Sequence, residues 1–279
     1  MIINIFLNGL NSRYLGKMEL KEIITHRFRD LDSVIRADKK FRLGVFVFMR
    51  QIFKLLRLNE SGLKNLVRDN TLFLDGKKFY TRKNTLDFLF FSKYYEPQTT
   101  KFLKENMGKT FIDVGSHIGR FAVLMSEKFD NVYAIEPHPN NFKYLKKNIG
   151  LNRLKNVIPI NCAVSNSKKD LFIDNLEMNT GAAKIKSQGE NKVKCQKLDY
   201  LINQHKINLG KSSVILIDVE GHELEVLEGG KRALSSSNPT LIIESFNPKS
   251  ITDFLSRYGY HLKSTLDHYN HVFIKSKNI

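Results

Sequence analysis

The stretch TFIDVGSHIGRFAV (110–123) contains residue types that can hold a charged organic ligand. Gly115 and Gly119 follow an apolar run that includes Asp113 and is typical of a buried strand. A strand, a glycine turn and a helix in this order bring backbone N–H groups and a carboxylate to one edge of a sheet. Glu136 ends the next apolar run, where a carboxylate can accept hydrogen bonds from both hydroxyls of a ribose.

The spacing D-x-G-x-x-x-G differs from the dinucleotide fingerprint G-x-G-x-x-G. Ser116 and His117 widen the loop, and a carboxylate at Asp113 would repel a pyrophosphate. The same carboxylate would attract an ammonium or a sulfonium group, because opposite charges pair. S-adenosylmethionine carries both groups and no phosphate. The sequence therefore predicts S-adenosylmethionine as the cofactor rather than NAD.

A second set of chemical groups lies in IDVEGHE (217–223). Asp218 and Glu220 are two residues apart, so on a strand they would point the same way. His222 has an ordinary pKa of about 6.5, which suits a general base that Glu220 could orient. We expect these three residues to be catalytic. The alternative is that His222 only shapes the start of a helix and that Glu220 only complements its dipole. Together with Glu244 they would suit Mg²⁺, but nothing in the spacing demands a metal and we expect none.

The elements that must position these groups alternate between strands and helices from residue 110 onward. Apolar runs predict strands over 111–114, 131–137, 157–165, 213–223 and 240–246. Helices are expected near 118–128, and over 139–150 ending at Gly150, 222–234 and 250–259 capped by Ser250. Residues 260–267 and 271–277 form a closing hairpin, and 170–197 form an insertion of short strands and a loop. This order predicts an open, mostly parallel, doubly wound α/β sheet with a terminal antiparallel hairpin.

The preceding part of the chain has a different pattern. We expect a basic, mainly helical N-terminal extension over 1–70 and the catalytic domain over 71–279. Residues 71–82 contain Asp75-Gly76 between alternating apolar residues, which predicts a hairpin, and 85–95 favours a helix ending before Pro97. Residues 41–58 favour an amphipathic helix with a basic stripe. That helix either packs on the domain or lies at a membrane surface.

Composition limits the classes of protein. The chain has 279 residues and 45 Lys and Arg against 28 Asp and Glu, a net charge of +17. Residues 1–110 carry 22 of these cations and 11 of the anions, so most of the excess lies there. Such a balance favours anionic partners or serves only solubility. Two cysteines without a C-x-x-C pair indicate a reducing compartment, and we expect a cytoplasmic protein, with peripheral membrane contact through 41–58 as an alternative.

Four blocks together resemble the FkbM-type methyltransferase family over roughly 90–275. They are FIDVGSHIGRF, VYAIEPHPNNFKYLKKNIGLN, CAVSNS and ILIDVEGHELEVLEGGKRAL followed by NPTLIIE. The resemblance implies a Rossmann-like class I fold, S-adenosylmethionine as methyl donor, and methylation of hydroxyls on sugars and related molecules. Asn166 stands where the family usually has an acid, so no role is carried over to it.

Carried over residue by residue, the resemblance places Asp113, Gly115 and Gly119 at the methionine part of the cofactor. It places Glu136 at the ribose and Cys162 and Ala163 at the adenine. We also expect three neighbours to contact the cofactor: His117, Pro137 and Asp218.

The leading hypothesis is an O-methyltransferase acting on a carbohydrate, a glycolipid or a related small molecule. An RNA methyltransferase is the second, suggested by the charge, although the chain lacks the [DN]-P-P-[YF] tetrapeptide of amino-group methylases. The third is an inactive scaffold of the same fold that binds a membrane. The sequence also leaves open a homo-oligomer.

Overall fold

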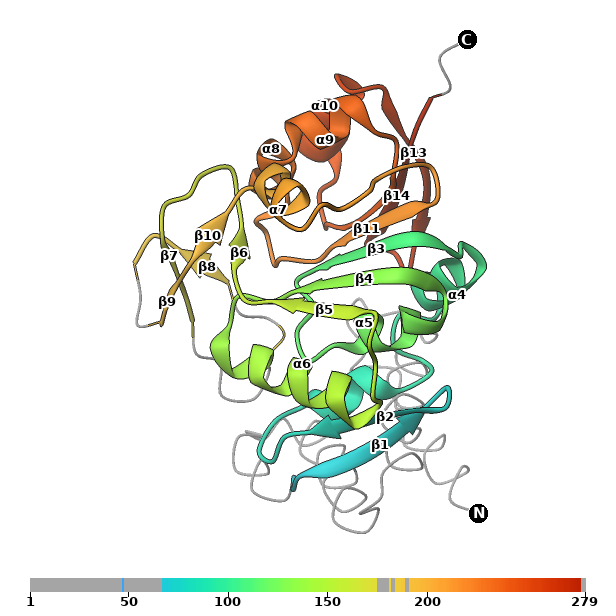
Figure 1. Ribbon diagram of the computed structural model, residues 1–279, viewed down its shortest axis with the longest axis vertical. Helices are drawn as coiled ribbons and strands as arrows, with labels where there is room; N and C mark the ends of the chain where they lie inside the picture. The colour runs from blue at the N-terminus through green and yellow to red at the C-terminus, as the bar shows by residue number, and fades with distance from the viewer. Residues whose placement is uncertain (1–46, 48–66, 175–180, 182–183, 189–190, 277–279) are drawn as a thin grey trace, which may run out of the picture.

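The computed structural model describes residues 47, 67–174, 181, 184–188 and 191–276. Its centre is a seven-stranded sheet of order β13-β14-β12-β11-β3-β4-β5 (Figure 1). The strands are β3 (Gly108–Val114), β4 (Phe129–Ile135), β5 (Val157–Ile160), β11 (Ser213–Ile217), β12 (Thr240–Glu244), β13 (Tyr260–Leu266) and β14 (Asn270–Lys275). Pairing is parallel from β12 to β5, and β14 is antiparallel to both its neighbours. The predicted Rossmann-like, doubly wound sheet with a terminal hairpin is confirmed.

The order of the strands determines where a ligand can bind. From β3 the chain moves outward to β4 and β5, then returns to β11 on the other side of β3 and continues to β12. The direction of winding therefore reverses between β3 and β11. In open α/β sheets a crevice forms at such a point, outside the carboxyl ends of the strands.

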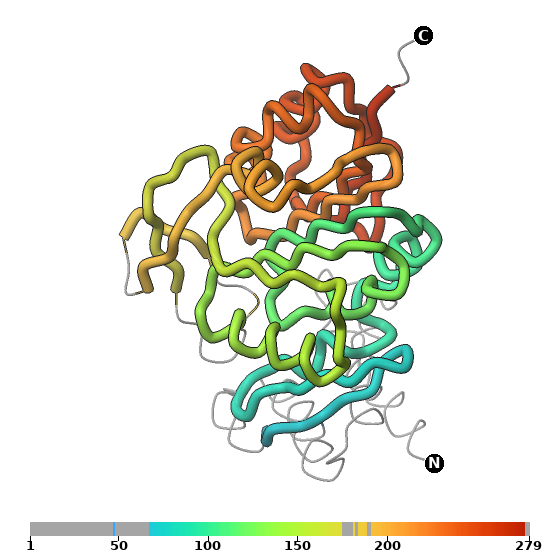
Figure 2. Tube along the Cα trace, viewed as in Figure 1, coloured from blue at the N-terminus to red at the C-terminus, as the bar shows by residue number. Residues whose placement is uncertain are grey.

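Helices cover both faces of the sheet (Figures 1 and 2). One face packs against α4 (Pro97–Glu105), α5 (Arg120–Leu124) and α6 (Pro139–Leu151). The other packs against α7 (Leu198–Gln204), α8 (Glu223–Gly229), α9 (Lys231–Ser236) and α10 (Lys249–Ser256). Alternate residues of one strand enter opposite cores, as Phe111 and Ile112 do in β3, because side chains on a strand alternate between faces.

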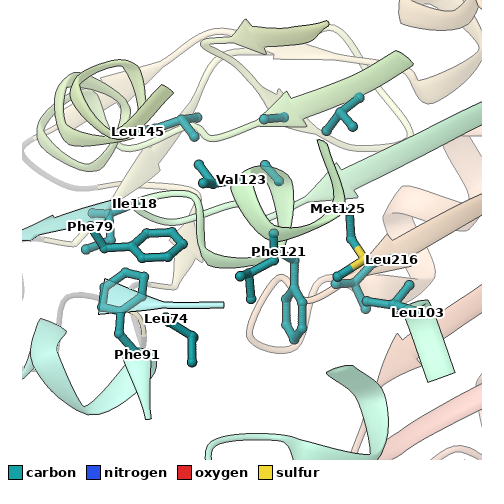
Figure 3. Packing of buried hydrophobic residues seen from close by; sticks show 14 of the residues in the cluster. Leu74, Phe79, Phe91, Leu103, Ile118, Phe121, Val123, Met125, Leu145 and Leu216 are labelled. Carbon is teal, nitrogen blue, oxygen red and sulfur yellow. The ribbon is translucent and has the colours of Figure 1, made fainter. Parts of the chain in front are cut away.

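The predicted Asp75-Gly76 hairpin is confirmed as β1 (Asn70–Leu74) and β2 (Lys77–Thr81). Both turn residues have positive φ, as a tight two-residue hairpin turn requires. Strand β2 lies against α6, where Asn148 accepts a backbone N–H from it at 2.7 Å. Phe79 of β2 stacks on Phe91, with ring centroids 4.3 Å apart (Figure 3). The hairpin thus extends the core beyond the sheet.

The prediction of a single strand over 157–165 is wrong. β5 ends at Ile160, and β6 (Ala163–Val164) pairs instead with β10 (Cys195–Gln196). Asn161 lies at the break and donates to the backbone oxygens of Glu136 and Pro137 at 2.8 and 3.1 Å. The short strands expected within 170–197 are present as β7 (Leu171–Ile173), β8 (Ile185–Lys186) and β9 (Asn191–Val193).

Residues 85–95 form a short 3₁₀ helix, η2 (Asp87–Phe91), rather than the expected α-helix. Pro97 does not end a helix but begins α4, because proline lacks only an N–H that the first turn leaves unpaired. Asp267, from the turn between β13 and β14, accepts the N–H groups of Gln98 and Thr99 at 3.1 and 2.8 Å. The turn between the last two strands therefore caps the N-terminus of α4, about 170 residues earlier in the chain.

Three boundaries also differ from expectation. Helix α10 starts at Lys249, after Pro248, so Ser250 lies inside the helix and does not cap it. Helix α6 continues through Gly150 to Leu151. Strand β11 ends at Ile217, and the segment that follows is a turn before α8 rather than more strand. Short helix 125–127, η3 (Met125–Glu127), continues α5 as expected.

The predicted N-terminal extension lies almost wholly outside the described residues. Of the amphipathic segment 41–58 only Val47 is described, and its side chain is buried. The division at residue 70 therefore stays a prediction. In the described part of the chain, no helix has both the length and the hydropathy needed to cross a membrane.

Candidate active site

The turn after β3 leaves no room for a side chain at its first glycine. Gly115 has φ of +94°, and a Cβ there would lie 1.7 Å from the backbone oxygen of Asp218. Gly119 has φ of +93°, and its Cβ would lie 2.7 Å from Leu145 Cδ1. Glycine adopts such φ values without strain. The turn therefore passes directly against the end of β11 and exposes its backbone to the crevice.

Asp113 lies beneath this turn, near the end of β3. Its side chain is buried, and Oδ2 accepts the N–H of Ala122 at 3.2 Å. Burial raises the pKa of Asp113 to about 7, because an ionised carboxylate loses the stabilisation of water. A cation placed beside it would restore that stabilisation. This is the property expected of a residue that holds an ammonium or sulfonium group.

Glu136 follows β4, and its side chain is buried. Its Oε2 accepts the backbone N–H of His117 at 2.9 Å, and Oε1 accepts the backbone N–H of His138 at 2.9 Å. Asn141 donates its side-chain amide to Oε1 at 3.3 Å. Burial raises the pKa of Glu136 to about 7 against the effect of these donors. The carboxyl is thus fixed in one orientation toward the crevice.

A cavity of about 300 Å³ lies at the carboxyl ends of the strands, at the reversal point between β3 and β11. All but one of the residues expected at the cofactor line it: Asp113, Gly115, His117, Glu136, Pro137, Cys162, Ala163 and Asp218. Gly119 is not among its lining residues, because it starts α5 and faces Leu145. Burial raises the pKa of Cys162 to about 12, so the thiol stays neutral and suits an adenine ring.

The same cavity is rich in carboxyl groups besides those of Asp113 and Glu136. Asp218 and Glu220 line it, joined by Glu244 at the end of β12 and by Glu96. The carboxyls of Asp218 and Glu244 hydrogen-bond to each other. Burial, and then the charge of Glu244, raise the pKa values of Asp218 and Glu220. The two residues do share the cavity, but a turn brings them there rather than the alternation of a strand.

Glu220 has an unusual backbone for its type. Its φ is +55°, and Gly221 follows with φ of +100°. A non-glycine residue in the left-handed region costs about 1 kcal/mol or more, and such strain clusters at functional sites. The turn after β11 therefore holds the Glu220 side chain in the cavity at some expense to stability.

His222 lies elsewhere. It is the N-cap residue of α8 and does not line the cavity. Its Nε2 lies 2.9 Å from Ser165 Oγ, and its Nδ1 lies 3.6 Å from Glu225 Oε2. No hydrogen bond joins it to Glu220 among the described residues. The expected pairing of these two side chains is therefore not present, and His222 occupies the N-cap position of α8 without a side-chain hydrogen bond to the helix backbone.

Sequence reasoning missed the wall formed by Phe90, Tyr95 and Glu96, which belong to no motif. Arg120, the first residue of α5, holds this wall in place. Its guanidinium donates to the backbone oxygens of Phe90 and Tyr95 and, at 3.2 Å, to Thr100 Oγ1. Only the tertiary structure brings these segments together, so no local pattern could have indicated them.

A buried ion pair also links the N-terminal hairpin to the cofactor end of the cavity. Arg82 donates to Asp87 through Nε at 2.6 Å and Nη2 at 2.9 Å. Its Nη1 donates to Asn141 Oδ1 at 2.8 Å, and its Nη2 lies 3.2 Å from His117 Nε2. His117 and Asn141 both bind Glu136. The hairpin segment thus supports the two residues that orient the carboxylate of Glu136.

Metal ligation was considered for Asp218, Glu220, His222 and Glu244. Within the described residues, no group of three or more His, Cys, Asp or Glu side chains is arranged to hold a metal ion. His222 faces away from the carboxyls that it would have to join. The described geometry gives no support to that set of ligands.

Comparison with known proteins relates this geometry to a family. The model of the FkbM methyltransferase domain matches residues 113–262. The chain belongs to this family. The match begins at Asp113 and includes both the glycine turn and the carboxyl-rich turn after β11. The predicted class I methyltransferase fold and the predicted membership in the FkbM family are therefore confirmed.

Individual relatives match this chain over part of its length or at low sequence identity. The hexuronic acid methyltransferase AglP of Haloferax volcanii is 36% identical over 148 residues, which are 52% of this chain and 60% of AglP. The tRNA (guanine(37)-N(1))-methyltransferase Trm5b of Pyrococcus abyssi is 38% identical over 53 residues, 19% of this chain and 16% of Trm5b. The crystal structure of an FkbM methyltransferase from Methylobacillus flagellatus is 17% identical, with a TM-score of 0.41, and covers 91% of this chain and 60% of that one. The chain thus spans 60% or less of the length of these relatives.

We expect the affinity for S-adenosylmethionine to rise with pH. In the empty protein Asp113 and Glu136 have pKa values of about 7, so both are largely protonated at pH 5.5 and largely ionised at pH 7.5. Only the ionised form attracts a cation, so affinity should increase by roughly tenfold or more across this range. Burial lowers the pKa of His117 to about 4, so its ring stays neutral throughout. Titration calorimetry at several pH values measures the effect, and Asp113→Asn should make the profile flatter. An affinity independent of pH would contradict the assignment.

Proposed function

We propose that this protein transfers the methyl group of S-adenosylmethionine to a hydroxyl of a sugar, a glycolipid or a related small molecule. The observation that carries the proposal is that one cavity is lined both by Asp113, Gly115 and Glu136, which suit the cofactor, and by the acidic residues Asp218 and Glu220. A donor and an acceptor bound in this cavity would lie side by side, as an in-line transfer requires.

The residues present fit this cofactor. The backbone of the turn can approach the methionine part closely, because Gly115 has no side chain. Asp113 attracts the cationic groups, Glu136 accepts from the ribose hydroxyls, and Cys162 and Ala163 border the adenine. When bound, S-adenosylmethionine supplies an electrophilic methyl group on a sulfonium.

The acceptor end must orient the hydroxyl and remove its proton. We assign the removal to Glu220, since it lines the cavity, has a raised pKa and is held in a strained turn. Its carboxylate would take the proton of the acceptor hydroxyl, while bound S-adenosylmethionine would supply the methyl group. Asp218, hydrogen-bonded to Glu244, keeps the neighbouring wall in place.

An RNA acceptor is the second candidate. The net charge of +17 and the short match to a tRNA methyltransferase favour it. Against it, the acceptor end is lined by carboxyls, which would repel phosphates. The longer relative, a hexuronic acid methyltransferase, favours a carbohydrate.

The deciding experiment is incubation of the protein with methyl-labelled S-adenosylmethionine and a fractionated cell extract. We expect the label in glycan or glycolipid, released by glycosidase treatment and unaffected by ribonuclease. Label in RNA that ribonuclease removes would select the second candidate. No incorporation into any fraction, together with normal cofactor binding, would favour the inactive scaffold.

A further inference from the structure

The acceptor end of the cavity, defined here by Phe90, Tyr95, Glu96, Glu220 and Glu244, has a charge that limits what can bind there. Its carboxyl groups come from three separate segments of the chain. Burial and the charge of Glu244 raise the pKa of Glu96 to about 8. Like charges this close cannot all ionise, so some of them keep protons. A further negative charge brought to the acceptor end would therefore be repelled by the carboxylates already there.

No described cation is free to balance an anionic ligand. Arg120 carries the only permanent positive charge among the described lining residues. Its Nη atoms donate to Phe90, Tyr95 and Thr100, and its guanidinium lies 5.3 Å from the centre of the Tyr95 ring. Turning it toward a ligand would release the wall that it holds. Lys184 attracts Glu220 but is exposed to solvent, where water and salt weaken its effect.

An exposed aromatic ring lies close to Glu244 in the sequence. Phe246, two residues after Glu244, is 87% exposed, although a ring of this size usually finds cover. Its centroid lies 5.9 Å from that of Tyr269, a residue close enough to Glu96 and Glu244 to feel their charge. Phe246 is not among the lining residues of the cavity, but its ring follows the segment that ends in Glu244. An aromatic face near an acidic cavity suits a sugar ring, which has an apolar face and a polar edge.

We propose that the acceptor end takes an uncharged sugar or one bearing an ammonium group, and that it rejects a uronic acid. The inference rests on the proposed function and narrows the class of sugar that can be the acceptor. It separates this protein from its hexuronic acid methyltransferase relative by the charge of the acceptor. The carboxylates repel an anionic sugar and attract a sugar that bears an ammonium group, so both effects contribute to the selectivity.

Three matched probes test the proposal: the methyl glycosides of glucose, glucosamine and glucuronic acid. An equimolar mixture is incubated with the full-length protein and labelled S-adenosylmethionine, and mass spectrometry measures how the label divides. In parallel, the binding of each glycoside to the protein loaded with S-adenosylhomocysteine is measured by saturation-transfer NMR. We expect the glucoside and the glucosaminide each to exceed the glucuronide by at least about tenfold in both measurements, because juxtaposed like charges cost several kcal/mol.

Variants identify the cause. Glu244→Gln keeps the side-chain shape and removes a carboxyl, so it should raise the share of the glucuronide several-fold. Glu96 has a pKa of about 8, so Glu96→Gln should have that effect only above pH 8, where the carboxyl is ionised. Glu127→Gln is the matched control, because Glu127 is exposed and far from the cavity lining, and it should leave the ratio unchanged. Phe246→Ala should weaken all three glycosides alike. Near-ultraviolet circular dichroism checks that each variant is folded.

The outcomes separate the two proposals. If the expected order appears in binding but no label is transferred, methyl transfer to sugars is wrong and the charge preference stands. If the glucuronide binds or reacts as well as the others, the charge preference is overturned even if transfer is efficient. If none of the three binds, the acceptor end is not a sugar site and both proposals fail.

Discussion

Glu220→Gln should reduce turnover by roughly 10²–10⁴-fold, the loss expected when a general base is removed. Glutamine has the same shape but cannot accept the proton of the acceptor hydroxyl at neutral pH. Cofactor affinity should change by less than about threefold, because the proposed cofactor contacts are made by Asp113 and Glu136 rather than by Glu220. Single-turnover transfer from labelled S-adenosylmethionine, with calorimetry of cofactor binding, measures the two effects separately.

His222→Gln provides the comparison. The imidazole contacts Ser165 and Glu225 rather than the cavity, so turnover should fall by less than about tenfold. The rate of the parent enzyme should also decline at acid pH as Glu220 gains a proton, and the Glu220→Gln variant should lose that decline. A larger loss in His222→Gln than in Glu220→Gln would return the role of base to the histidine.

Gly115→Ala should destabilise the protein by roughly 3–5 kcal/mol and abolish cofactor binding. A Cβ at this position would lie 1.7 Å from the backbone oxygen of Asp218, and φ of +94° is unfavourable for alanine. The turn cannot move away, because Gly115 N–H bonds to Ile135 at 2.9 Å on its other side. Urea denaturation monitored by circular dichroism measures the change in the free energy of unfolding.

Gly150→Ala makes the same change where the structure allows it. Gly150 lies inside α6, and a Cβ there would meet nothing within 4 Å. Alanine favours a helix over glycine, so this variant should be more stable by up to about 1 kcal/mol. Equal stability of the two variants would show that the close approach of the turn to β11 does not occur in solution.

The sequence predicted the parts of the fold that have a local cause. Asp75-Gly76 indicated a hairpin because few other residue pairs adopt positive φ twice. The glycine turn and Glu136 were found because each follows a buried strand of the parallel sheet. The small strand β6 was not separated from the main-sheet strand that precedes it, since a two-residue strand has no periodicity to read.

The candidate site was predictable where one motif supplies it and not where several segments meet. Asp218 and Glu220 came from one motif and do line the cavity. His222 belongs to the same motif, but the turn that begins after Ile217 directs its ring to Ser165. Glu96 has no motif at all. It reaches the cavity because Pro97 starts a helix that Asp267 caps from the far end of the chain.

The wall held by Arg120 affects how this enzyme could diverge from its relatives. Phe90, Tyr95 and Glu96 precede the 113–262 region shared with the family, and Tyr269 follows it. The groups assigned to the methyl donor all lie within that region. Substitutions at Tyr95, Glu96 and Tyr269 can therefore reshape the proposed acceptor site, whereas Arg82 in the same N-terminal flank supports His117 and Asn141 and has to be kept for the donor. A lineage with this arrangement can exchange one acceptor for another while its methyl-donor chemistry is inherited intact.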